Sequence, residues 1–307
     1  MSDQSIHDPR GQGPDYGAWQ RTLRGLLRNR LALTGIIVLV VIVIAAVLAP
    51  LLAPQNPYDL SQLDIMDGRL TPGSQSLSGM TYWLGTDDQG RDLLSAILYG
   101  TRTSLLVGVV SAVLALAIGM LLGLISAWRG GKIDTLIMRI VDIQLSFPPI
   151  LIALILLALL GQGVDKIILA LVVTQWAYYA RTIRGAALVE RQRSYMEAAR
   201  GMALPVRQIL LRHLLPNCLP PLIVVATMRV AYAIMLEATL SFLGIGLPVT
   251  KPSLGLLIAN GFDYLMSGDY WISLFPGLTL LLLIVAINLI GDALRDLLNP
   301  RSEEAQQ

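Results

Sequence analysis

Residues 33–53 read LTGIIVLVVIVIAAVLAPLLA and lie within a longer run, residues 31–58, that contains no charged side chain. A helix needs about 20 consecutive apolar residues to cross the hydrocarbon core of a bilayer. This stretch therefore predicts a first transmembrane helix. A cleavable signal peptide is the alternative, but such peptides have a shorter apolar core that follows a much shorter N-terminal region.

The composition of the whole chain also indicates a membrane protein. Of its 307 residues, 54% are hydrophobic and 14% are charged, whereas soluble domains carry about 25% charged residues. The formal net charge of +2 gives no sign of the basic face that binds nucleic acid. The single cysteine, Cys218, excludes an intramolecular disulfide, and with only two histidines, His7 and His213, we expect no metal site.

Five further segments are apolar and almost free of charge, namely residues 103–128, 143–164, 167–180, 220–246 and 270–291. The segment 167–180 is the shortest, and it spans only if Arg181 and Arg184 extend their side chains to the membrane interface. We therefore expect an all-α membrane protein with six transmembrane helices. An even number of spans places both termini on the same side.

The basic residues predict the orientation of these spans. With the N-terminus in the cytoplasm, most of the 23 Lys and Arg residues fall in cytoplasmic segments, and the external segments hold only Arg69, Arg91, Arg102, Lys166 and Lys251. Cytoplasmic loops of membrane proteins carry an excess of Lys and Arg. Both termini are therefore expected in the cytoplasm.

The spans predict how the chain is divided. The expected parts are an N-terminal cytoplasmic tail, the first span, an external loop, a five-helix core that contains a cytoplasmic loop (181–217), and a C-terminal cytoplasmic tail: residues 1–32, 33–53, 54–102, 103–291 and 292–307. In the first tail, apolar residues recur at helical spacing between arginines, at Trp19, Leu23, Leu26 and Leu27. This spacing favours either a helix lying on the membrane surface or an extension of the first span.

The second span carries a small residue at every fourth position, at Ser111, Ala115, Gly119, Gly123 and Ala127. Every fourth residue lies on one face of a helix, and small side chains let another backbone approach closely. We expect this face to pack either against another helix of the same chain or against a second membrane subunit.

The fifth span contains two charged residues, Arg229 and Glu237. They are eight residues apart, about two helical turns, so they point in similar directions but are too distant for a direct pair. Charges at membrane depth usually face a bundle interior or water. We expect a shared polar network or partners on other helices, which either line a transport pathway or hold the helices together.

The external segment contains a glycine pair, Gly85 and Gly90, with the spacing of a phosphate-binding loop. That loop requires Lys and then Ser or Thr, but Arg91 and Asp92 follow here. The nearby aspartates lack the closing glutamate of a calcium loop, so they indicate turn formation. We expect no catalytic residue, nucleotide, metal or other cofactor in this chain.

The connection before the fifth span is too long for a simple hairpin, and residues 187–217 read ALVERQRSYMEAARGMALPVRQILLRHLLPN. Glu197, Ala198 and Ala199 favour a helix, which Gly201 is expected to interrupt.

A second short helix is expected to follow this interruption. Pro205 suits its first turn, and Pro216 is expected to end it. Residues at helical spacing give it a common face, made of Val206, Ile209, Leu210 and His213. We therefore predict a helix–turn–helix at the cytoplasmic surface.

This segment carries a resemblance to a known family. EAARGMA (197–203), followed by RHLLPN (212–217), resembles the cytoplasmic loop of the membrane subunits of bacterial ABC importers, in which a short helix docks in a groove of a partner ATPase. Such loops usually have a glycine six residues after the glutamate, where Ala203 stands here. The resemblance implies an ATPase-coupling role for Glu197, Ala198, Ala199, Gly201, Ala203, Pro205, His213 and Pro216.

Four other segments narrow the resemblance to the dipeptide, oligopeptide and nickel subfamily. They are LGTDDQGRDLLS (84–95), MRIVDIQLSFP (138–148), LSFLGIG (240–246) and GDALRDLLNP (291–300). Together the matches extend over about residues 33–301, and they resemble the C-type permease of a peptide importer. The resemblance implies one extra N-terminal span before a five-helix importer core.

The resemblance also implies a function and a set of partners. The chain is expected to be a non-catalytic permease in the bacterial inner membrane, which forms half of a pathway for di- or oligopeptides. The expected partners are a second related permease, two subunits that bind ATP and Mg²⁺, and an extracytoplasmic substrate-binding protein. The alternatives are import of nickel or another small solute by the same machinery, an ion-driven secondary transporter, and a membrane scaffold without a pathway.

Overall fold

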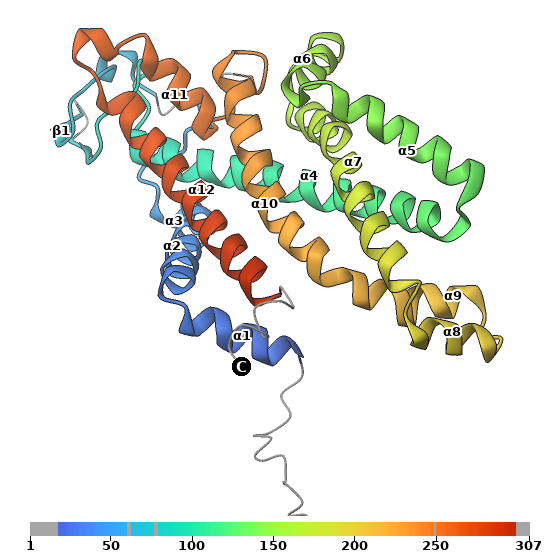
Figure 1. The fold of residues 1–307 in the computed structure, drawn as a ribbon. Helices are drawn as coiled ribbons and strands as arrows, with labels where there is room; N and C mark the ends of the chain where they lie inside the picture. Colours follow the sequence, from blue (N-terminus) through green and yellow to red (C-terminus); the bar gives the residue numbers. More distant parts are fainter. Residues whose placement is uncertain (1–17, 60–62, 77–78, 249, 299–307) are drawn as a thin grey trace, which may run out of the picture.

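The computed structural model describes residues 18–298 except 60–62, 77–78 and 249, and it describes no side chains before residue 23 (Figure 1). His7 and most of the two predicted tails therefore lie outside the described residues. The long helices are α2 (Arg30–Val47), α4 (Leu93–Arg129), α5 (Gly131–Ser146), α6 (Pro149–Leu160), α7 (Val164–Glu190), α10 (Leu215–Phe242) and α12 (Trp271–Leu297). The short elements are α1 (Ala18–Arg28), α3 (Ala49–Leu52), β1 (Ser74–Gln75), β2 (Thr81–Tyr82), α8 (Ser194–Gly201), α9 (Val206–Gln208) and α11 (Leu254–Phe262).

Among the described residues, four helical stretches are long and apolar enough to cross a membrane: α2, α4, the stretch from Val206 to Phe242, and α12. Helices α5 and α6 together make a fifth if the bent pair is one span. The expected all-α membrane fold is confirmed, with one two-stranded hairpin added by β1 and β2. The count of six spans stays a prediction, because the apolar part of α7 ends at Arg181.

The predicted span at 143–164 is not one continuous helix. The chain breaks after Ser146, and α5 and α6 meet at an angle of 91°. Phe147 is extended, and Pro148 precedes Pro149, the first residue of α6. A proline lacks the amide proton that a helix interior requires, and it disfavours helical dihedral angles in the residue before it. The two prolines therefore turn one apolar run into two helices.

Helix α4 begins at Leu93, ten residues before the predicted second span. Asp92 caps its N-terminus, because the Asp92 Oδ2 atom accepts a hydrogen bond of 2.8 Å from the Ser95 amide. Such a cap satisfies one of the free amide groups in the first turn of a helix. The hydropathy of the sequence therefore located the apolar part of this helix but not its beginning.

The small-residue face of α4 packs against α7. A side chain added at Gly119 would place its Cβ atom 2.5 Å from the Trp176 carbonyl oxygen, and one added at Gly123 would lie 2.5 Å from the Ala180 carbonyl oxygen. All five small residues of this face are buried: Ser111, Ala115, Gly119, Gly123 and Ala127. The two helices thus approach closely within one chain.

At the N-terminus, α1 and α2 are separate helices. Asn29 lies between them in an extended conformation, and its side-chain oxygen accepts a hydrogen bond of 3.0 Å from the Leu31 amide. Figure 1 shows α1 lying across the end of α2. The described part of this segment is thus not a straight extension of the first span. Helix α2 packs against α12, where a Cβ atom on Gly35 would lie 2.9 Å from the Ala286 carbonyl oxygen.

The elements near the two ends of the helices form two groups. Figure 1 shows α1, α8, α9 and the last turn of α12 at one end of the molecule, and α6, α11 and β1 at the other. The predicted cytoplasmic loop therefore lies at the end opposite to the predicted external segment. This arrangement is compatible with the topology that the basic residues predict.

Candidate functional site

The predicted coupling loop forms an elbow over residues 194–214, which consists of α8, a tight turn, α9 and a π-helical turn at Ile209–Leu214. Gly201 was expected to interrupt the first helix, but it is the last residue of α8. The chain instead reverses at Ala203, whose φ of 52° lies in the left-handed region. Sequence reasoning placed the break two residues too early because it assigned it to the glycine.

The second part of the elbow also differs from the prediction. Pro205 precedes the first residue of α9 instead of lying in its first turn. Pro216 does not end a helix, since it lies in the first turn of α10. The wider π-helical turn ends at Leu214, two residues before Pro216. In an α-helix the ring of a proline clashes with the carbonyl oxygen four residues before it, and the wider turn gives the ring of Pro216 more room.

The π-helical turn changes which residues face the protein. Ile209 and Leu214 are buried, five residues apart, while Val206 is exposed and His213 is only half-buried. The predicted common face of Val206, Ile209, Leu210 and His213 followed an α-helical period, which does not hold across a π-helical turn.

One side of α8 packs inward. Met196 and Ala199 are buried in the same apolar cluster as Ile209, Leu214 and Cys218. The opposite side of the elbow is exposed, and we call it the elbow face: Glu197, Ala198, Gly201, Met202 and Val206. Of the eight predicted coupling residues, Ala199 therefore faces the core of the chain.

The end of α7 and the elbow both contact the end of α4. The Arg191 guanidinium donates to the Ala127 carbonyl oxygen and lies 5.6 Å from the centre of the Trp128 ring. The Arg200 guanidinium lies 5.7 Å from the same ring. Contacts between a cation and an aromatic ring are attractive at these distances. A displacement of α8 would therefore act directly on Trp128.

Two further arginines link α7 to α5. The Arg184 guanidinium donates two hydrogen bonds of 2.6 Å to the Asp134 carboxylate, and Arg181 pairs with Asp142. Arg181 and Arg184 were expected to reach the membrane interface without a stated partner. The acids of α5 are thus the partners of both arginines, and the two-pronged contact of Arg184 with Asp134 is strong and directional.

Glu237 lies in a buried polar centre where α4, α10 and the start of α11 meet. Its side chain is fully buried, and its carboxylate accepts hydrogen bonds from the Ser104 hydroxyl at 2.8 Å and from the Ser241 hydroxyl at 2.7 Å. The Leu254 amide donates to the Ser104 oxygen at 3.4 Å. Buried polar groups are costly unless they are hydrogen-bonded, so this centre holds the three helices in a fixed arrangement.

Arg229 lies elsewhere, beside a cavity of about 470 Å³. Its guanidinium carbon is 3.4 Å from the centre of the Tyr178 ring and 5.3 Å from that of Tyr232. The cavity is lined by residues of α7, α10 and α12: Tyr178, Val225, Met228, Arg229, Ala231, Tyr232, Met235, Ile284 and Asn288. The structure shows no contact between Arg229 and Glu237 in the described part of the chain, so the expected shared network is not formed.

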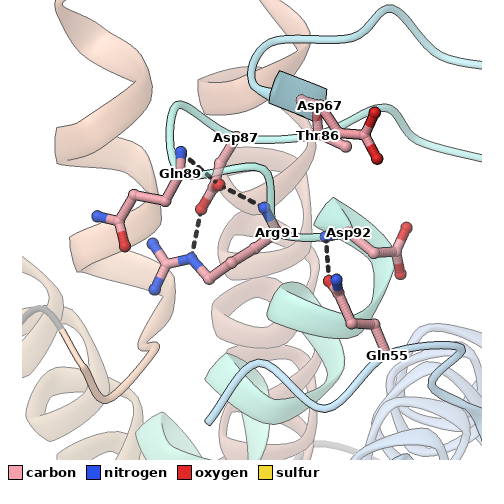
Figure 2. Close-up of polar contacts among 7 residues, drawn as sticks. All are labelled: Gln55, Asp67, Thr86, Asp87, Gln89, Arg91 and Asp92. Carbon is pink, nitrogen blue, oxygen red and sulfur yellow. Dashed lines mark hydrogen bonds and ion pairs between the residues drawn. The ribbon is translucent and has the colours of Figure 1, made fainter. Parts of the chain in front are cut away.

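The aspartate segment that was predicted to be external is a tightly bonded turn (Figure 2). Asp87 Oδ2 accepts a hydrogen bond of 2.6 Å from Arg91 Nε, and Asp87 Oδ1 accepts one of 2.9 Å from each of the Gln89 and Arg91 amides. Gly90 has a φ of 76°, which glycine adopts without strain. The turn-forming alternative is thus the one that the structure supports.

This turn is joined to the end of the first span by Gln55, which sequence reasoning missed. The Asp92 amide donates to Gln55 Oε1 at 2.7 Å (Figure 2). The Gln55 amide donates to the Ser95 hydroxyl at 3.2 Å. Burial raises the pKa values of Asp88 and Asp92.

No group of three or more His, Cys, Asp or Glu side chains within the described residues is placed to hold a metal ion.

Comparison with known proteins gives two family matches. Residues 119–304 match the family described as binding-protein-dependent transport system inner membrane component. Residues 17–72 match the N-terminal transmembrane domain of oligopeptide transport permease C. The first match includes the whole elbow, Arg229 and Glu237, and the second includes the first span.

Several curated proteins match over most of their length. A putative peptide transport system permease protein of Brucella abortus is 42% identical over 280 residues, which are 91% of each chain. The dipeptide transport system permease protein of Haemophilus influenzae is 37% identical over 90% of this chain and 92% of its own. The probable D,D-dipeptide transport system permease protein of Escherichia coli is 38% identical over 89% and 88%.

Among solved structures, the inward-facing MetNI methionine ABC transporter is similar in fold. One crystal form has a TM-score of 0.54 and 23% identity, and the match covers 66% of this chain and 96% of that chain. A second crystal form gives a TM-score of 0.55 and 22% identity. At this level of identity the likeness concerns the arrangement of helices.

Proposed function

This chain belongs to the family of inner membrane components of binding-protein-dependent transport systems, and we propose that it forms one half of the membrane pathway of an ATP-driven importer for di- or oligopeptides. The observation that carries this proposal is the match to peptide and dipeptide permeases over about nine tenths of both chains. Proteins of this kind are membrane permeases and not enzymes, so ATP hydrolysis belongs to other subunits.

The proposed complex contains a second, related permease, two ATP-binding subunits that hold ATP and Mg²⁺, and an extracytoplasmic substrate-binding protein. It lies in the bacterial inner membrane, with both termini of this chain in the cytoplasm. The excess of basic residues in the predicted cytoplasmic segments supports this orientation.

The elbow face is the proposed contact with an ATP-binding subunit. It presents two apolar side chains, Met202 and Val206, which are 67% and 49% exposed. Exposed apolar side chains mark an interaction site when they gather in one patch, and we propose that these two do so when an ATP-binding subunit docks. Beside them, Ala198 and Gly201 are small enough to let a partner backbone approach.

Movement of the elbow would switch the pathway between two states. When the ATP-binding subunits close on ATP, they displace α8, and the contacts of Arg191 and Arg200 with Trp128 transmit that displacement to α4. Because α4 is packed closely against α7, the two helices move together. Such coupling is a shift between two discrete arrangements of packed helices.

Co-purification of the ATP-binding subunits, together with uptake of a labelled tripeptide, tests the proposal. The Gly201→Trp variant should insert into the membrane but lose the ATP-binding subunits, because its bulky side chain projects from the elbow face. Gly185→Trp is the matched control, since Gly185 also lies in a helix with open space around it, outside the elbow. Normal co-purification and uptake with Gly201→Trp would show that the coupling site lies elsewhere.

Uptake also decides the substrate class. We expect ATP-dependent uptake of the tripeptide in vesicles that contain the complete complex. Uptake of nickel ions without uptake of any peptide would instead favour the metal-importing alternative.

A further inference from the structure

We propose that Arg229, whose guanidinium contacts the rings of Tyr178 and Tyr232, binds the carboxylate of the transported solute. This inference rests on the proposed function, because it assigns the ligand of a cavity in the pathway. It commits to one chemical class, a small solute with a free carboxylate such as the C-terminus of a short peptide.

The first argument is the position of the charge. Arg229 lies near the middle of α10, a helix within a stretch that is long and apolar enough to span a membrane. A charged side chain at such depth is costly, and it is normally paired or faces a water-filled path. No carboxylate in the described part of the chain forms an ion pair with Arg229, and its contacts there are with the two tyrosine rings.

The second argument is the geometry of the guanidinium. At 3.4 Å from the centre of the Tyr178 ring, the group stacks on the ring face. Stacking covers a flat face of the guanidinium and leaves the N–H donors at its edge available, and those donors match a carboxylate with two parallel hydrogen bonds. The aromatic rings thus support the cation without using the groups that would bind an anion.

The third argument is the composition of the cavity wall. Met228 and Met235 lie one on each side of Arg229 in sequence, and Asn288 approaches from α12. Methionine side chains are flexible and adapt to ligands of different shape. A volume of about 470 Å³ falls in the range of small-molecule sites. One fixed cation with an adaptable apolar wall suits solutes that share a carboxylate but differ in their side chains.

The test compares two substrates in membrane vesicles that contain the complete importer and its binding protein. ATP-dependent uptake of trialanine is measured against uptake of trialanine amide, which lacks the carboxylate. A hydrogen-bonded charge pair corresponds to roughly tenfold or more in binding. We therefore expect Arg229→Gln to reduce the preference for the acid over the amide by about that factor. The binding protein is the same throughout, so its own preference cancels in this comparison.

Two further variants complete the experiment. Arg102→Gln removes an exposed arginine from α4, outside the cavity lining, and should leave the preference unchanged. Arg229→Lys keeps the charge but loses the planar stack, so it should keep part of the preference. If the Arg229→Gln permease does not insert into the membrane at all, Arg229→Lys decides instead, and an unchanged preference there would overturn the assignment.

The remaining outcomes separate this inference from the proposed function. Equal loss of acid and amide uptake in Arg229→Gln would overturn the carboxylate assignment, and so would an unchanged ratio. Loss of the second permease from the purified Arg229→Gln complex would show that Arg229 pairs with that subunit instead, which also overturns it. If the wild-type complex transports neither tripeptide, the proposed function itself fails.

Discussion

Ala203 has a φ of 52° at the point where the elbow reverses direction. For residues other than glycine the left-handed region costs roughly 1–2 kcal/mol, because the Cβ atom approaches the neighbouring carbonyl oxygen. Two residues earlier, Gly201 is helical and has open space around its Cα atom. The position that would benefit from glycine is thus occupied by alanine, and the glycine stands where alanine would be favourable.

The placement of Gly201 in the helix and Ala203 in the turn predicts how substitutions at these two positions affect the elbow. Gly201→Ala should preserve the elbow and stabilise α8 by roughly 0.5–1 kcal/mol, because alanine has the higher helix propensity. Ala203→Val should destabilise the turn of the elbow, since β-branched residues are outliers at positive φ. Proteolysis of the elbow in the purified complex, with Ala203→Gly as the control that relieves the strain, measures the effect. Equal sensitivity of Gly201→Ala and Ala203→Val would contradict the described turn.

At the scale of helices, Glu237 of α10 accepts a hydrogen bond from the Ser104 hydroxyl of α4, and Ser104 in turn accepts one from the Leu254 amide at the start of α11. The Ser241 hydroxyl, on α10 itself, donates a second hydrogen bond to Glu237. Glu237→Leu would leave two buried hydroxyl groups without their acceptor, at a cost of roughly 1–3 kcal/mol for each unpaired group. Glu237→Gln keeps an acceptor oxygen in the same shape, so it should cost less. Thermal unfolding of the purified permease in detergent should therefore rank wild type, Glu237→Gln and Glu237→Leu in decreasing stability.

The same measurement separates Glu237 from Arg229. The sequence left two arrangements open for these charges, a shared network or separate partners on other helices. In a shared network, neutralising Arg229 would partly rescue a neutral residue at position 237. In the structure, each group has its own partners, and eight residues of helix separate them by about 12 Å. The effects of Glu237→Gln and Arg229→Gln should therefore add to within about 0.5 kcal/mol in the double variant. A rescue larger than this would show that the two residues do share one network.

The apolar runs predicted where helices lie, but local side-chain chemistry decided where they begin and end. Hydropathy does not register that Asp92 caps α4 at Leu93, or that Pro148 and Pro149 divide the run 143–164. The elbow was located correctly as a helical pair, yet its turn and the π-helical winding before Pro216 depend on backbone conformations that no periodicity reveals.

The candidate cavity was predictable only in part. A charge inside an apolar span marked Arg229 as a residue of interest, because such charges are costly. Its stacking on Tyr178 depends on the relative register of α7 and α10, which a single sequence does not contain. For the same reason Gln55 carried no signal, since its partners, Asp92 and Ser95, lie about 40 residues further along the chain.

At the scale of the whole molecule, the two ends of the helical assembly should lie on opposite sides of the membrane. Single cysteines in a Cys218→Ala background test this with a thiol reagent that does not cross the membrane. Ser74 lies in the β1–β2 hairpin and Thr250 in the connection between α10 and α11. Both lie in segments that are predicted to be external, so cysteines there should be labelled from outside in intact cells. A cysteine at Ser194, which is exposed at the start of α8, should be labelled only after the membrane is opened, since the basic residues place the elbow in the cytoplasm.

Cys218 is itself buried, so its replacement serves only to remove background. Labelling of position 194 in intact cells would invert the topology and place the elbow out of reach of any cytoplasmic ATPase.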